Sequence, residues 1–149
     1  MLRNFTFSIF FFSGITLISI LFLPSLLLPK NIVFFGGKLM GHWTGLCLKI
    51  LMSTKIEILG RENILKNDKF FIAATHQSMF ETFYLQTIFK SPIFILKKEL
   101  LKIPIFGWYL RKIGSISIDR NKITKDNLGY SDQIKKHINN SNRPIIIFP

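Results

Sequence analysis

The sequence predicts an α/β fold in which an N-terminal membrane-associated helical hairpin precedes a largely parallel sheet with helices on its faces. Three observations predict it. Residues 5–29 carry no charged side chain, and from Lys55 onward short apolar runs alternate with amphipathic ones. Several of these runs are apolar throughout, as strands buried on both faces are. We therefore expect a membrane-associated helical segment over residues 1–54 and the N-terminal part of an α/β domain over residues 55–149.

The composition limits the class of protein. Of 149 residues, 48% are hydrophobic and the mean hydropathy is +0.33, which is too apolar for a disordered chain. Lys and Arg number 20 against 8 acids, a net charge of +12 that suits nucleic acid, an anionic membrane surface or an acidic carrier. The single cysteine, Cys47, excludes an internal disulfide framework, and three scattered histidines form no metal-ligand spacing. We expect neither a metal nor another cofactor.

The first apolar run is "FTFSIFFFSGITLISILFLPSLLLP", residues 5–29. As a helix it is long enough to cross a hydrocarbon core of about 30 Å. A cleaved signal peptide is the alternative, because Arg3 supplies a basic start. The run exceeds the roughly 7–15 apolar residues of a signal peptide and lacks a small-x-small cleavage site. We interpret it as a retained membrane segment.

A second segment, residues 31–53, is less apolar and contains glycines four residues apart at Gly37, Gly41 and Gly45. This spacing allows close packing of helices. Its two lysines argue against a deep span, although both could snorkel to the interface. A hairpin that dips into one leaflet therefore fits better than two crossings. The flanking charges, Arg3 and Lys30, are too balanced to set the orientation of the hairpin in the membrane.

The remaining elements follow from periodicity and turn residues. Strands are expected over residues 54–60 ("TKIEILG"), 69–75 ("KFFIAAT"), 91–98 ("SPIFILKK"), 114–119 ("GSISID") and 143–149 ("RPIIIFP"). Helices are expected over residues 77–90, over 98–114 as two pieces broken at Pro104, and over 124–139. Because the last strand lacks a following helix, we expect a C-terminally incomplete domain, the N-terminal fragment of a protein about 80–120 residues longer.

The junction between the second strand and the first of these helices carries His76 and Glu81 in "HQSMFE". An imidazole hydrogen-bonded to a carboxylate is a general base with a fixed tautomer. Because no Gly-x-Ser-x-Gly pattern is present, such a base would act on a substrate hydroxyl. The spacing alone leaves open a histidine that caps the helix and a glutamate in solvent.

Two basic motifs follow. "GSISIDR", from Gly114 to Arg120, would place a guanidinium at the sheet edge, where it can bind phosphate with two hydrogen bonds. The alternative is an ordinary turn at Asp119 and Arg120. "KKELLKIPIFGW" begins with Lys97, which could lie beside a phosphate or simply be a solvated surface lysine.

Together and in this order, the motifs resemble those of the glycerophospholipid acyltransferases, specifically the 1-acyl-sn-glycerol-3-phosphate (lysophosphatidate) acyltransferases. The first motif of that family is His-x4-Asp, matched from His76 to Glu81 with glutamate in place of aspartate. The second is Gly-x4-Asp-Arg, matched from Gly114 to Arg120. The third begins Phe-Pro, matched by the last two residues of the chain. The resemblance covers roughly residues 31–149.

The resemblance implies a membrane enzyme without a cofactor that makes phosphatidate in phospholipid biosynthesis. His76 would deprotonate the sn-2 hydroxyl of lysophosphatidate, which attacks the thioester of acyl-CoA or acyl carrier protein, while Glu81 orients the imidazole. Arg120 and Lys97 would hold the acceptor phosphate. The other motif residues expected to bind substrate are Gly114, Asp119, Phe148 and Pro149. The expected location is the inner or cytoplasmic membrane, with the active site facing the cytoplasm.

Other functions are compatible with parts of the sequence. The acceptor could be another lysolipid, such as a lyso-ornithine lipid, or the chain could be an inactive truncated membrane protein of the same fold. A nucleic-acid-binding module would account for the charge, but it would not account for residues 5–29 and no recognition motif is present. We expect membrane lipids, lysophosphatidate and an acyl donor as partners, and no nucleic acid.

Overall fold

The structure is a computed structural model. It describes residues 2–64, 70–75, 78–118, 132, 134–136, 139–140 and 142–148. Contacts divide the chain into two compact units, the first made of residues 1–64 and 77–89 and the second of residues 65–76 and 90–149. The sequence analysis divided the chain by membrane association instead, into a membrane-associated segment, residues 1–54, and an α/β domain, residues 55–149. That boundary stays a prediction.

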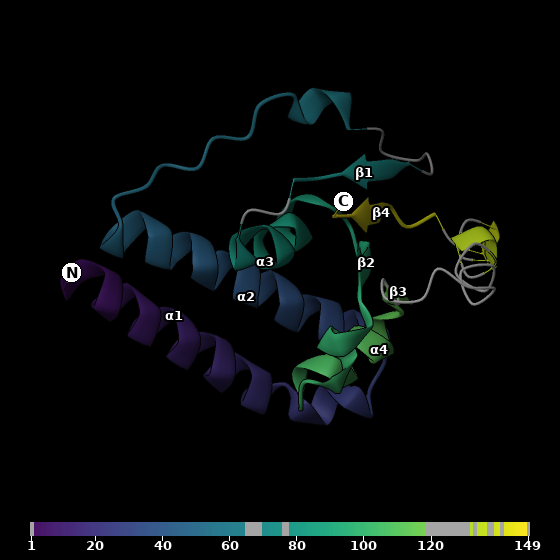
Figure 1. The fold of residues 1–149 in the computed structure, drawn as a ribbon, viewed down its shortest axis with the longest axis horizontal. Coiled ribbons are helices and arrows are strands. Elements are labelled where there is room, and N and C mark those ends of the chain that lie inside the picture. The colour runs from purple at the N-terminus through teal and green to yellow at the C-terminus, as the bar shows by residue number, and fades with distance from the viewer. Residues whose placement is uncertain are drawn as a thin grey trace. The chain divides into compact units, whose positions relative to one another are not determined.

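The first unit begins with the predicted helical hairpin. Helix α1 (Leu2–Leu21) leads through a short 3-10 helix, η1 (Leu23–Leu26), into α2 (Lys30–Leu51), and α1 and α2 lie side by side (Figure 1). Pro24 lies in the first turn of η1 and Pro29 is the residue before α2. Proline is tolerated at both places because the amide it lacks would have no helical partner there.

Helix α1 is apolar on nearly every side. Among the residues that the structure describes, it is the one helix long and apolar enough to cross a membrane, with 6% of its most apolar window buried. Leu17 and Leu21 are 68% and 69% exposed. This exposure distinguishes α1 from the buried core helix of a soluble protein. A signal sequence would also be this long and this apolar. The retained membrane segment stays a prediction.

The glycine row of α2 packs against a third helix of the first unit, α3 (Met79–Ile88). A Cβ at Gly41 would lie 2.6 Å from the backbone oxygen of Phe83, and a Cβ at Gly45 would lie 3.1 Å from the ring of Tyr84. The close packing predicted from the spacing is therefore present. Its partner is the helix that contains Glu81 of the first motif, whereas glycine rows in membranes commonly pair two spanning helices.

We expect Gly41→Ala to destabilise the first unit. A methyl group there meets the backbone of Phe83 as well as the Thr87 side chain, and the backbone cannot rotate away. The clash of about 1–3 kcal/mol therefore outweighs the roughly 1 kcal/mol that alanine gains over glycine in a helix. Gly37→Ala is the matched control, because the added methyl meets the end of the Gln86 side chain, which can rotate away. Thermal unfolding of both variants checks this, and a Tm for Gly41→Ala at or above that of Gly37→Ala would contradict it.

The second unit contains a four-stranded sheet made of β1 (Phe71–Ala73), β2 (Ile93–Lys97), β3 (Ile116–Ile118) and β4 (Ile145–Ile147). The strand order is β1-β4-β2-β3 and every pairing is parallel. The prediction of an α/β fold with a parallel sheet is confirmed. Since all four strands run the same way, their carboxyl ends meet at one edge of the sheet.

The core of this sheet consists of isoleucines on the two central strands and their neighbours. Ile93, Ile95, Ile116 and Ile145 form one buried cluster, at most 3% exposed, and Ile134 packs against it. β-Branched side chains fit a pleated surface that is covered from above. Ile134 belongs to the helix predicted over residues 124–139, most of which lies outside the described residues.

The connection from β2 to β3 confirms the predicted break at Pro104. A 3-10 helix, η3 (Lys98–Lys102), precedes it and α4 (Phe106–Ile113) follows it. Gly107 faces the backbone of Leu101, where a Cβ would lie 2.6 Å from the carbonyl carbon. The two helical pieces can therefore approach this closely only because Gly107 has no side chain.

The strand predicted over residues 54–60 was wrong. Residues 54–60 form no strand with any described part of the chain, and the 3-10 helix η2 (Arg61–Asn63) follows Gly60, whose φ is +73°. The predicted alternation is still visible, with Leu59 88% exposed and Ile58 half-buried. The sequence alternation therefore predicted which side chains are covered, whereas a strand also needs a hydrogen-bonded partner.

Candidate active site

The start of α3 holds the acidic residue of the first motif. Ser78 is the N-cap, and its Oγ accepts a hydrogen bond from the Phe80 backbone N–H at 3.1 Å. In return, Oε2 of Glu81 accepts from the Ser78 backbone N–H at 3.0 Å and from the Ser78 hydroxyl at 3.3 Å. This reciprocal pair is a capping box. The positive end of the helix dipole also stabilises the carboxylate in this first turn.

The sequence analysis missed Ser78, although a signal for it was present. Ser-x-x-Glu before an apolar helix predicts a capping box, and "SMFE" fits that pattern. The cap of α3 is therefore Ser78, so the alternative in which a histidine caps this helix does not describe its N-cap. Glu81 is half-buried and held by its own helix, which fixes one end of the predicted histidine–glutamate pair.

We expect Ser78→Ala to cost about 1 kcal/mol of stability, the usual loss for an N-cap serine. It removes the acceptor for Phe80 and one of the two donors to Glu81, while the Ser78 backbone N–H remains. Ser78→Asp, which restores a capping acceptor, is the control. Chemical denaturation of the two variants checks this; equal stability of Ser78→Ala and the unchanged protein would show that the cap contributes nothing.

Four of the predicted site residues, His76, Asp119, Arg120 and Pro149, lie outside the described residues. The strands that precede them are described. β1 ends at Ala73, and the next amide, at Ala74, donates to the Ile147 carbonyl at 3.0 Å. β3 ends at Ile118 and β4 at Ile147. His76 of the first motif, Asp119 and Arg120 of the second, and the Phe-Pro pair of the third therefore each come after the carboxyl end of a strand in one parallel sheet, the edge where α/β folds place their ligands.

Lys97 and Phe148 also lie at this edge, on neighbouring strands. Lys97 is the last residue of β2 and is exposed, and Phe148 directly follows β4. In the register of these strands, Ile95 pairs with Ile147. The ring of Phe148 stacks on Phe94, with centroids 6.3 Å apart and planes 10° from parallel.

The alternation of side chains puts these two residues on opposite faces of the sheet. Lys97 continues the row of Ile93 and Ile95, which faces the isoleucine cluster, whereas Phe148 shares the face of Phe94. The edge thus offers a cation on one face and an aromatic ring on the other. Their predicted contacts with substrate stay predictions.

Gly114 lies at the amino end of β3, away from that edge. It caps α4 in the left-handed region with φ +82°, and the Ser115 amide after it donates to the Leu110 carbonyl at 3.0 Å. Only glycine adopts this conformation without strain, and the turn aims the chain from α4 into β3. This accounts for the glycine of the second motif; a contact of Gly114 with substrate stays a prediction.

Comparison with known proteins then identifies the family. The family model described as Acyltransferase matches residues 55–149, well over half of the chain. The chain belongs to the Acyltransferase family. Family membership confirms the resemblance that the three motifs suggested, and the Acyltransferase match includes all of them.

Three relatives of this Acyltransferase chain carry the name 1-acyl-sn-glycerol-3-phosphate acyltransferase. The Pseudomonas aeruginosa protein is 38% identical over 74 residues, covering 50% of this chain and 28% of that protein. The Helicobacter pylori protein is 40% identical over 81 residues, covering 52% and 32%. The Saccharomyces cerevisiae protein is 25% identical over 103 residues, covering 68% and 33%.

The matches span about a third or less of the length of these curated relatives. No solved structure matches the chain. Among the residues that the structure describes, no group of three or more His, Cys, Asp or Glu could hold a metal ion.

Proposed function

We propose that this acyltransferase moves an acyl chain from acyl-CoA or acyl carrier protein to the sn-2 hydroxyl of lysophosphatidate, giving phosphatidate. The observation that carries the proposal is the Glu81 carboxylate, held at the first turn of α3 in a motif that begins with His76. The names of the relatives support lysophosphatidate as the acceptor.

In the proposed reaction, His76 removes the proton of the sn-2 hydroxyl while that oxygen attacks the thioester carbonyl carbon. A new ester C–O bond forms, the C–S bond breaks, and the proton passes from the imidazole to the departing sulfur. Glu81 accepts a hydrogen bond from the other ring nitrogen of His76 and stabilises the imidazolium formed during attack. General-base catalysis of this kind contributes typically about 10²–10⁴-fold in rate.

Basic residues would hold the acceptor. Arg120 directly follows the motif aspartate after β3, and a guanidinium binds a phosphate monoester with two parallel hydrogen bonds. The exposed ammonium of Lys97 ends the neighbouring strand β2, in register with Ile118. A phosphate carrying nearly two negative charges is well matched to two such cations.

The membrane would supply both lipids. Helix α1 offers an exposed apolar surface, and the net charge of +12 favours an anionic lipid surface, at about 1 kcal/mol for each basic residue close to it. In this proposal the first unit seats the protein in the bilayer, where lysophosphatidate reaches the site without leaving the membrane.

The test is acyl transfer in membranes that contain the protein expressed from its natural reading frame. Radiolabelled oleoyl-CoA and oleoyl-acyl carrier protein are offered with lysophosphatidate, with lyso-ornithine lipid, or with lysophosphatidylcholine, whose phosphate is blocked by choline. We expect labelled phosphatidate from lysophosphatidate and little product from the blocked acceptor. With His76→Ala we expect no labelled phosphatidate. Labelled phosphatidate that still forms in His76→Ala membranes, or a preference for an acceptor without a free phosphate, would contradict the proposal.

A further inference from the structure

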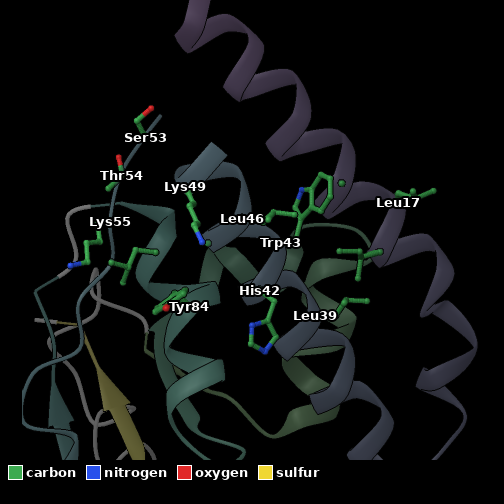
Figure 2. A pocket seen from close by; sticks show the side chains of 14 residues that line it. Leu17, Leu39, His42, Trp43, Leu46, Lys49, Ser53, Thr54, Lys55 and Tyr84 are labelled. Atoms are coloured by element: carbon green, nitrogen blue, oxygen red, sulfur yellow. The ribbon is translucent and has the colours of Figure 1, made fainter. Parts of the chain in front are cut away.

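The first unit contains a pocket of about 890 Å³ that the proposed reaction does not use. Its walls come from α1, α2, residues 53–56 and Tyr84 of α3 (Figure 2). Glu81 is not among the lining residues. Pockets of about 300–1,000 Å³ enclose most of a drug-sized ligand, so this one can take up an elongated molecule such as an acyl chain.

The pocket is polarised from one side to the other. In Figure 2, Leu17 of α1 and Leu39 of α2 lie on one side, and Ser53, Thr54 and Lys55 lie on the opposite side. Lys49 of α2 lies between them, next to the polar side. An apolar wall that leads to hydroxyls and ammonium groups matches a ligand with a hydrocarbon chain and a polar head.

The charged residues of the pocket favour a ligand whose polar head group is negatively charged. None of the lining residues is acidic, whereas two are lysines. Lys55 is already paired with Glu57, at 2.6 Å between Nζ and Oε1, and both side chains are largely exposed. Within the described part of the chain, no acidic side chain lies within ion-pairing distance of Lys49. Of the two lysines that line the pocket, Lys49 is therefore the one that pairs with no acid of the described residues, and we assign an anionic ligand to it.

The apolar wall is pre-formed by a contact between the two helices of the hairpin. The Trp43 indole donates from Nε1 to the Phe10 carbonyl at 3.2 Å and lies over Gly14, where a Cβ would come within 2.7 Å of the ring atom Cζ2. Trp43 thereby fixes α2 against α1 while its ring lines the pocket. Ligand binding would therefore cost little conformational entropy at this wall.

We propose that this pocket binds an anionic phospholipid of the surrounding bilayer, with one acyl chain against Leu17, Leu39 and Trp43 and its phosphate at Lys49. The exposed apolar surface of α1 beside the pocket makes a bilayer lipid the occupant that the site meets first. No covalent step is involved. The site is independent of acyl transfer, so it is expected in a protein that cannot react.

Trp43 itself provides the readout, because bromine atoms on an acyl chain quench a tryptophan that they touch. The protein carries Trp108→Phe, which removes the other tryptophan of this chain, and His76→Ala, which prevents turnover. It is purified in a neutral detergent and titrated with brominated phosphatidylglycerol or brominated phosphatidylcholine. The fluorescence lost in a matched Trp43→Phe protein is subtracted. We expect Trp43 to be quenched at lower concentrations of phosphatidylglycerol than of phosphatidylcholine.

Charge variants test the assignment to Lys49. We expect Lys49→Gln to reduce the preference for phosphatidylglycerol about fivefold, the effect of one basic residue beside an anionic lipid. Lys90→Gln removes the same charge from an exposed site in the second unit and should leave the preference unchanged. Equal quenching by the two lipids, or an unchanged preference in Lys49→Gln, would overturn the proposal. Quenching by brominated lysophosphatidate alone would do so too, since the pocket would then be an acceptor site.

Discussion

Glu81→Gln is expected to lower kcat on the order of 10²–10⁴-fold while α3 stays folded. The two effects separate because the carboxylate caps α3 and, in the proposed mechanism, also pairs with His76. A glutamine oxygen can still accept from the Ser78 backbone N–H, since Glu and Gln both serve at this position of a capping box. A neutral amide could not stabilise the imidazolium that the proposed reaction forms on His76. The measurement is phosphatidate formation at saturating lysophosphatidate, alongside the thermal stability of the variant.

Two further substitutions sharpen this test. Glu81→Asp introduces the acid of the His-x4-Asp motif and should retain much more activity than Glu81→Gln. Glu81→Ala removes both the charge and the cap, so it should lose stability as well as activity. A Glu81→Gln protein with normal turnover would end the assignment of Glu81 to the catalytic pair. A loss that merely matched that of Ser78→Ala would reduce Glu81 to a capping residue.

Arg143→Ala is expected to destabilise the second unit by about 3 kcal/mol, because it leaves several backbone acceptors without their donor. The half-buried guanidinium donates to the Ser91 carbonyl at 2.7 Å, to the Pro92 carbonyl at 3.3 Å and to the Ile113 carbonyl at 2.9 Å. It thus ties together the segments that lead into β2, into β4 and out of α4. Burial lowers the pKa of Arg143, but an arginine stays charged at neutral pH.

Hydrogen exchange at Ile145, Ile146 and Ile147 measures this loss of stability, since these amides belong to the strand that Arg143 precedes. Arg143→Lys should recover only part of the protection, because a compact ammonium cannot reach several carbonyls in a fork. Arg111→Ala is the control: its guanidinium is exposed and donates to the Leu101 carbonyl. Protection in Arg143→Ala equal to that in Arg111→Ala would show that Arg143 does not hold the sheet.

Most strands and helices could be predicted because their signals are local. "SPIFILKK" and "RPIIIFP" are apolar runs introduced by proline, and they form the two central strands β2 and β4. The break at Pro104 follows from the amide that proline lacks. The family could also be predicted, since the motifs combine rare residue types at fixed spacings and order.

Partners across the fold could not be predicted from local signals. Residues 54–60 have the alternation of a strand but pair with no strand in the part of the chain that the structure describes, and the glycine row of α2 packs on α3. Likewise, nothing in "NRPIIIFP" shows that its arginine bonds to carbonyls some 30 to 50 residues earlier in the chain. Such contacts depend on which segments meet, and many pairings are compatible with the same pattern.

The sequence by itself determined the class of fold, the parallel character of the sheet, the hairpin and the chemistry carried by its motifs. These depend on periodicity, on turn residues and on the identity of side chains, all of which are properties of short segments. The tertiary structure alone decided that Ser78 holds Glu81, that Lys97 and Phe148 lie on opposite faces of one edge, and that a polarised pocket forms around Lys49. These depend on distances between segments, and only packing sets those distances.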